Sequence, residues 1–125
     1  MLSRDEILNA KDLPTETVNV PEWGGSVKIR SITAFERDSF EQSIIDGKKT
    51  NMSNIRARFC ALIIVDDKGD RVFGDLDMAI LGRKSGKALG RIFDAGQKLN
   101  GFSKEDFEEL EKNSGKTPTD DLPTT

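Results

Sequence analysis

The stretch TETVNVPEWGGSVKIRS, residues 15–31, decides the fold of the N-terminal part of this chain. Apolar and polar residues alternate on both sides of PEWGG, which is the period of a half-buried β-strand. Pro21 cannot donate a hydrogen bond to a strand ladder, and Gly24 and Gly25 accept a positive φ at little cost. We therefore predict a β-hairpin over about residues 16–31. Its apolar face is expected to carry Val18, Val20, Val27 and Ile29.

The chain's only tryptophan, Trp23, lies in the loop of this hairpin. An exposed tryptophan could anchor a partner protein, because tryptophan is enriched among binding hot spots. It could instead fold over the hairpin, because a two-stranded hairpin is marginally stable in water and needs its apolar face covered. We favour the second interpretation, in which the loop has a structural role. The loop residues assigned to that role are Pro21, Trp23, Gly24 and Gly25.

Helix-start signals occur on both sides of the hairpin. Ser3 followed by Glu6, and Thr33 followed by Glu36, both have the spacing of a capping box. Further along, apolar residues recur every three or four positions, which is the pattern of amphipathic helices, and VDDKGDRVF indicates a turn with Gly69 at its tip. The expected helices cover about residues 4–10, 34–46, 52–63, 76–81, 85–99 and 103–112.

These elements predict an α+β fold that is mainly α: a small helical domain with an N-terminal β-hairpin. A length of 125 residues is typical of one domain with one core, and we place that domain at residues 1–113. Residues 114–125, SGKTPTDDLPTT, contain two prolines and one large apolar residue, and they show no periodicity. We expect them to form a disordered tail, because they offer little apolar surface to bury.

The composition argues against most enzyme classes. The chain has no histidine and no tyrosine, so it lacks the commonest general base, and we expect neither catalysis nor a cofactor. A single cysteine excludes both an internal disulfide and a cysteine-based zinc site within this chain. The longest apolar run, FCALIIV, is far shorter than the roughly 20 residues that cross a bilayer. We therefore expect a cytoplasmic protein with no membrane contact.

The predicted helix at residues 85–99 leaves one alternative function open. A basic stripe of Lys84, Lys87, Arg91 and Lys98 could contact phosphates, as in a small phage or bacterial regulatory domain that binds nucleic acid. Asp94 interrupts this stripe, and amphipathic helices ordinarily present a charged face to solvent. With a net charge of −3 as well, we expect no nucleic-acid partner.

Two apolar helix faces are candidates for binding a partner protein, one within residues 52–63 and one within residues 89–99. The alternative, which we favour, is that both faces form the protein's own core, because a domain of this size has few apolar residues to spare. The candidate partner-binding residues are Met52, Ile55, Phe59, Leu89, Ile92 and Phe93.

Taken in order, the segments resemble the tail assembly chaperones of long-tailed, siphovirus-type bacteriophages and prophages. The resemblance covers roughly residues 2–113. VPEWGG is its most specific part, and no catalytic residue is carried over. The segments that carry the resemblance are LSRDEILNAKDL, VNVPEWGGSVKIRSIT leading into AFERDSFEQ, NIRARFCAL, VDDKGDRVF and KSGKALGRIFDAGQKLNG.

This resemblance implies a non-enzymatic protein of the bacterial host cytoplasm that is absent from the mature virion. It would bind the tape measure protein and help the tail tube protein polymerise around it. The resemblance further implies that relatives are often made in two lengths by a programmed ribosomal frameshift, and that some self-associate. All of these properties are expectations at this point.

Overall fold

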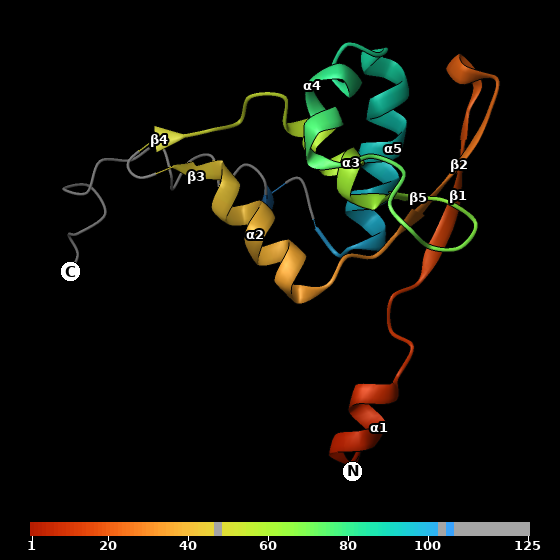
Figure 1. The fold of residues 1–125 in the computed structure, drawn as a ribbon, viewed down its shortest axis with the longest axis vertical. Helices are drawn as coiled ribbons and strands as arrows, with labels where there is room; N and C mark the ends of the chain where they lie inside the picture. Colours follow the sequence, from red (N-terminus) through yellow and green to blue (C-terminus); the bar gives the residue numbers. More distant parts are fainter. Residues whose placement is uncertain (47–48, 103–104, 107–125) are drawn as a thin grey trace.

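A computed structural model describes residues 1–46, 49–102 and 105–106 of the chain. It confirms the predicted α+β, mainly α fold (Figure 1). The elements, in chain order, are α1 (Arg4–Asn9), β1 (Thr15–Val20), the 3-10 turn η1 (Pro21–Trp23), β2 (Gly25–Arg30), α2 (Ala34–Ile44), β3 (Ile45–Asp46), β4 (Lys49–Thr50), α3 (Ile55–Ile63), β5 (Ile64–Val65), the 3-10 turn η2 (Asp75–Asp77), α4 (Met78–Leu81) and α5 (Gly86–Leu99).

The predicted hairpin is confirmed, and its loop is one residue shorter than PEWGG. β1 and β2 pair antiparallel with Val18 opposite Val27, and Gly25 already pairs with Val20. The chain therefore reverses over Pro21–Gly24, where Gly24 has a φ of 72°, a conformation that glycine adopts without strain. A third strand, β5, was not predicted. It pairs antiparallel with β2, so the sheet has the order β1-β2-β5.

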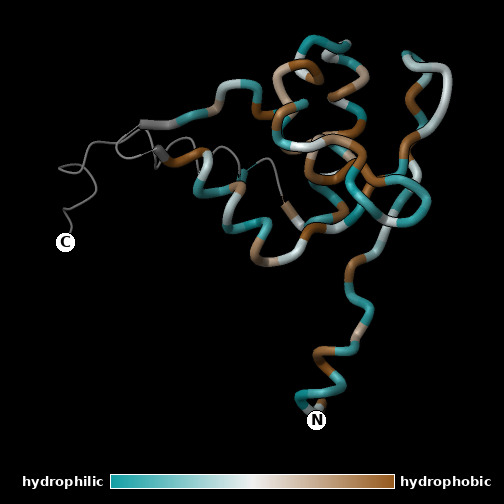
Figure 2. Tube along the Cα trace, in the orientation of Figure 1, coloured by the Kyte–Doolittle hydropathy of each residue, from teal (hydrophilic) through white to brown (hydrophobic). Residues whose placement is uncertain are grey.

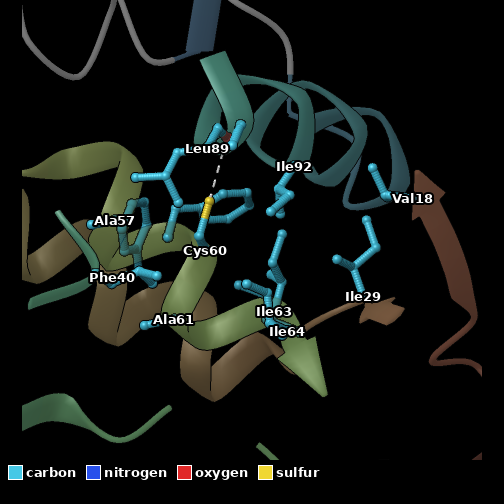
Figure 3. Close-up of a cluster of buried hydrophobic side chains, with 14 of the residues drawn as sticks. Val18, Ile29, Phe40, Ala57, Cys60, Ala61, Ile63, Ile64, Leu89 and Ile92 are labelled. Carbon is cyan, nitrogen blue, oxygen red and sulfur yellow. Dashed lines mark hydrogen bonds between the residues drawn. The ribbon is translucent and has the colours of Figure 1, made fainter. Parts of the chain in front are cut away.

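The core lies between this sheet, α3 and α5. Val18 and Ile29 point from the sheet toward Ile92 of α5 (Figure 3). Phe59 of α3 is fully buried, and its ring contacts three other phenylalanine rings with centroids 5.3 to 5.8 Å apart. Figure 2 shows hydrophobic segments gathered where these elements meet. The sequence therefore builds one core from strand and helix faces together.

Polar side chains tie the hairpin to the helices. Arg30 at the end of β2 donates two hydrogen bonds to Glu36, at 3.0 and 2.7 Å, and two more to the carbonyl oxygen of Leu62 at the end of α3. Asn100, the C-cap of α5, accepts a hydrogen bond from the backbone N–H of Ile32 at 2.7 Å. It also donates to the carbonyl oxygen of Arg30 at 3.4 Å. Both side chains fix the connection between β2 and α2.

Several predicted boundaries shift in the structure. α2 ends at Ile44 rather than near Asp46, because the chain turns into the short β3–β4 hairpin. α3 begins at Ile55 rather than at Met52, because Asn54 adopts a left-handed conformation with a φ of 55°. Of the predicted helix at residues 103–112, only the helical residues 105–106 are described. The predicted tail at residues 114–125 lies outside the described residues.

α1 stands apart from the rest of the fold. Its capping box is formed as predicted, with the backbone N–H of Glu6 donating to the Ser3 hydroxyl and the Ser3 N–H donating to the Glu6 carboxylate. No residue of α1 is buried, and the helix lies at the far end of the molecule from α4 and the hairpin loop (Figure 1). Within the described part of the chain, no helix is both long and apolar enough to cross a bilayer.

Candidate functional site

The six residues predicted to bind a partner face the interior. Phe59, Leu89 and Ile92 are buried, with exposed fractions of 0%, 4% and 0%. Met52, Ile55 and Phe93 are partly buried and pack against the same core. This burial agrees with the interpretation that we favoured from the sequence, in which both helix faces form the protein's own core. A partner surface has to be sought on other residues.

One residue of the basic stripe makes a contact that the sequence did not indicate. Arg91 of α5 forms an ion pair with Glu22 in the hairpin loop, with Nε–Oε1 and Nη2–Oε2 distances of 2.9 and 3.0 Å. The hydrogen bonds from Arg91 lower the pKa of Glu22, and the same contact raises the pKa of Arg91. Arg91 is nevertheless exposed, as are Lys84, Lys87 and Lys98, so the stripe forms the solvated face that the sequence predicted. The ion pair adds a contact between α5 and the η1 turn.

An open groove lies between α2, α3 and the η2–α4 segment. We call it the Phe35 groove, and its volume is about 510 Å³. Phe35 is 79% exposed, whereas the neighbouring Phe40 is buried. Leu62 and Met78 are partly buried in its wall. The groove is lined by Phe35, Glu36, Ser39, Phe40, Ser43, Arg58, Leu62, Arg71, Asp75 and Met78.

The charged rim of this groove is held in place by hydrogen bonds. Arg58 donates to the carbonyl oxygens of Asn51 at 2.8 Å and Ser53 at 3.0 Å, and burial lowers its pKa. Arg71 donates to the carbonyl oxygen of Ala61 at 3.2 Å and contacts Asp75 at 3.4 Å. Two fixed guanidinium groups thus lie beside an apolar floor, next to carboxylates. Such a surface suits an amphipathic segment that carries charges along an apolar face.

Phe35 is not among the binding residues predicted from the sequence, although the sequence contains a signal for its exposure. A residue in an α-helix is rotated by about 100° from its neighbour. Phe40 follows Phe35 by five positions and is therefore turned about 140° away from it, and Ile44 is turned by about 180°. Since Phe40 and Ile44 are buried, Phe35 has to face outward. This rotation was the available signal.

A second hollow, the Trp23 pocket, lies at the loop end of the hairpin and has a volume of about 500 Å³. Trp23 packs against the core as predicted for a structural loop residue. Its indole Nε1 is buried and has no acceptor among the described residues. Ile80 is 65% exposed at the rim of the pocket. The lining residues are Trp23, Phe73, Asp77, Ile80, Leu81 and Lys84.

The residues that line the two hollows include no cysteine, and the chain contains no histidine. The described residues contain no group of three or more His, Cys, Asp or Glu side chains placed to hold a metal ion. Cys60 is buried, as predicted, and its thiol donates to the carbonyl oxygen of Leu89 at 3.6 Å (Figure 3). Burial raises the pKa of this thiol to about 12, which leaves it protonated and weakly nucleophilic. What the two hollows offer a ligand or partner is therefore their shape, their apolar surface and their charged side chains.

Comparison with known proteins adds no identity: no family model matches the chain, and no curated protein or solved structure matches it either.

Proposed function

We propose that this protein is a non-enzymatic phage tail assembly chaperone that binds the tape measure protein through the Phe35 groove. The proposal joins the sequence resemblance described above to one structural observation, the 79% exposed Phe35 at the mouth of an apolar groove. If a partner buries this side chain, the burial contributes about 1.5 to 3 kcal/mol to binding.

The chemistry of the groove favours a helical client. A tape measure protein is long and helical with apolar stripes, and an apolar stripe can dock in a groove whose rim carries charge. Arg58 and Arg71 can pair with carboxylates on either side of such a stripe, and Glu36 and Asp75 can pair with its lysines or arginines. By holding this segment soluble, the protein would keep it available until the tail tube protein polymerises around it.

This role places the protein in the cytoplasm of the bacterial host and outside the mature virion. A longer frameshifted form is part of the same proposal. The messenger RNA tests that part directly, because a frameshift needs a slippery codon run followed by an overlapping reading frame near the end of the coding sequence.

Co-expression with a tape measure segment tests the client. We expect the wild-type protein to keep the segment soluble and to co-purify with it, and Phe35→Asp to reduce the recovered complex by at least about tenfold, the loss expected when a hot-spot residue is removed. Val72→Asp is the matched control, because Val72 is 50% exposed and lies outside the Phe35 groove. Equal recovery with both variants would contradict the groove assignment.

The same preparation tests the alternative function. A regulatory domain would retain DNA or RNA, and this retention would weaken steeply with added salt because phosphate contacts release counterions. Retention of nucleic acid with no capture of the tape measure segment would overturn the proposed function.

A further inference from the structure

The N-terminal arm, residues 2–13, exposes apolar side chains that no described part of the chain covers. Leu2, Ile7 and Leu8 are 71%, 55% and 65% exposed, and Leu13 is 44% exposed. α1 is nevertheless a capped helix. Six-residue helices are marginal in water, and most helices in proteins depend on packing of an apolar face. The arm therefore has the properties of a segment that packs on another surface.

A second unpartnered feature adjoins the arm. β1 is an edge strand, since it pairs with β2 and with no other strand among the described residues. Edge strands present unpaired backbone N–H and C=O groups, and proteins commonly blunt them with proline, lysine or a bulge. Between Thr15 and Val20 the strand contains none of the blunting residues, and its one charge is Glu16. This edge is open to pairing with a further strand.

We infer that two copies of this chain pair along their β1 edges about a two-fold axis, with the arm of each copy docked in the Trp23 pocket of the other. Antiparallel pairing of two β1 strands puts Thr15 of each copy beside the Val20 end of its partner. The arm leaves the strand at Thr15 and runs on in the same direction. It therefore continues past the hairpin loop of the second copy, where Trp23 and Ile80 border the pocket.

The length of the linker favours this exchange over docking within one chain. Pro14 is tied to Ser31 by a backbone hydrogen bond of 2.9 Å, so only residues 10–13 are free to bridge from α1. Five Cα steps extend to at most about 17 Å, whereas Pro14 to Val20 covers about 20 Å of strand. An arm docking in its own pocket would have to reverse at Pro14, and its linker would still end short of Val20.

The second copy's pocket lies within the same reach. From a paired β1 edge, the arm has to cross about two strand spacings, or roughly 10 Å, to pass over β1 and β2 of the partner. The pocket offers apolar walls at Phe73 and Ile80, and its rim carries Lys84 and Asp77. The first turn of α1 brings both signs of charge to that rim, because Arg4 and Asp5 lie on it.

Two-fold symmetry accounts for the choice of a reciprocal dimer. A stable specific interface buries roughly 1,000 Å² or more, which is a large area for one six-residue helix. In a two-fold dimer every contact occurs twice, so two arms, two pockets and one pair of strands contribute together. If the two-fold axis passes near Thr17 or Val18, Glu16 of one copy pairs with an uncharged residue of the other copy. The strand pairing then places no like charges opposite each other.

Sedimentation of the full chain over a concentration series tests the dimer. We expect the wild type to sediment as two chains, and Ile7→Asp with Leu8→Asp to raise the dimer dissociation constant at least tenfold. In samples dilute enough for both proteins to be monomeric, the melting temperature should be unchanged, because α1 has no buried residue. Ile80→Asp should have the same effect from the pocket side. Phe35→Asp is the control, since Phe35 is as exposed as these residues and lies in the other groove.

Disulfide trapping tests the arrangement. The native Cys60 should not form disulfides in this experiment, because it is fully buried. When one chain carries Leu8→Cys and the other Ile80→Cys, oxidation should join them covalently. A wild type that stays monomeric, a dimer indifferent to the arm variants, or trapping of Leu8→Cys by Phe35→Cys instead would overturn the inference. None of these measurements involves a tape measure protein, so they leave the proposed function to its own test.

Discussion

Gly96 is the position where a single methyl group tests the packing of the core. Gly96 lies in α5 directly against α3. A Cβ atom at this position would run into Cδ1 of Ile63 and would lie 2.9 Å from Cε2 of Phe59. Both side chains are fully buried, so neither can move aside into solvent. Gly90, six residues earlier on the same helix, has no such neighbour within 4 Å.

The same substitution should therefore have opposite effects at the two glycines. Glycine to alanine in a helix interior stabilises by about 0.5 to 1 kcal/mol when space is available, and we expect this gain for Gly90→Ala. At Gly96 the extra methyl overpacks the core, which costs about 1 to 3 kcal/mol. After subtracting the helix gain, Gly96→Ala should destabilise the protein by about 1 kcal/mol, within a range of about 0 to 2.5 kcal/mol.

Urea denaturation measures both free energies of unfolding, and an unchanged slope with urea would show that only stability has changed. In thermal melts the two variants should separate by several degrees, at roughly 4 °C per kcal/mol for a chain of this size. If Gly96→Ala is as stable as Gly90→Ala, α3 and α5 do not approach each other as described. The reasoning about the core would then be refuted.

Three further outcomes follow from side chains described above. Glu36→Gln should lower stability by about 2 kcal/mol at pH 7, since it removes the charged hydrogen bonds from Arg30. Burial opposes ionisation of Glu36, but those hydrogen bonds outweigh it and hold its pKa below 4.5. Denaturation at a series of pH values checks this. The difference in stability between wild type and Glu36→Gln should shrink as the pH falls through the lowered pKa, because the wild type then loses its charged hydrogen bonds. Trp23→Ala should cost about 2 to 4 kcal/mol in thermal or urea melts, near the lower end because the indole is only partly buried; a melt within a degree or two of wild type would make Trp23 an exposed contact. Cys60 should resist a thiol reagent at pH 8 and react completely once denaturant unfolds the chain, because burial raises the pKa of its thiol to about 12; rapid labelling of the folded protein would contradict this burial.

Much of the fold could be predicted from local signals in the sequence. Ser3 and Thr33 start helices as their spacing predicts, because a cap depends only on residues within one turn. Ser85 also caps α5. The hairpin was equally predictable, since alternation and PEWGG act within a few residues of each other. Its loop length was wrong by one residue because Gly25 can pair as well as turn.

Contacts between distant residues were not predictable in the same way. β5 is only two residues long and continues the apolar run of α3, so nothing in its own sequence separates it from the helix. The Phe35 groove combines residues of α2, α3 and η2, and its existence depends on how these elements pack. The ion pair between Glu22 and Arg91 spans 69 positions, and the spacing of either residue gave no sign of it.

The hydrogen bonds of Asn100 bear on how the protein is made. Ile32 and its partner Asn100 are 68 positions apart. At about 5 to 20 residues per second, a ribosome needs roughly 3 to 14 s to add that many residues. Throughout this interval the apolar face of the hairpin lacks α5, which covers it in the finished fold, and two strands alone are marginally stable. Each new molecule therefore completes its fold only after residue 100 has left the ribosome, and until then it is itself a chain with exposed apolar segments.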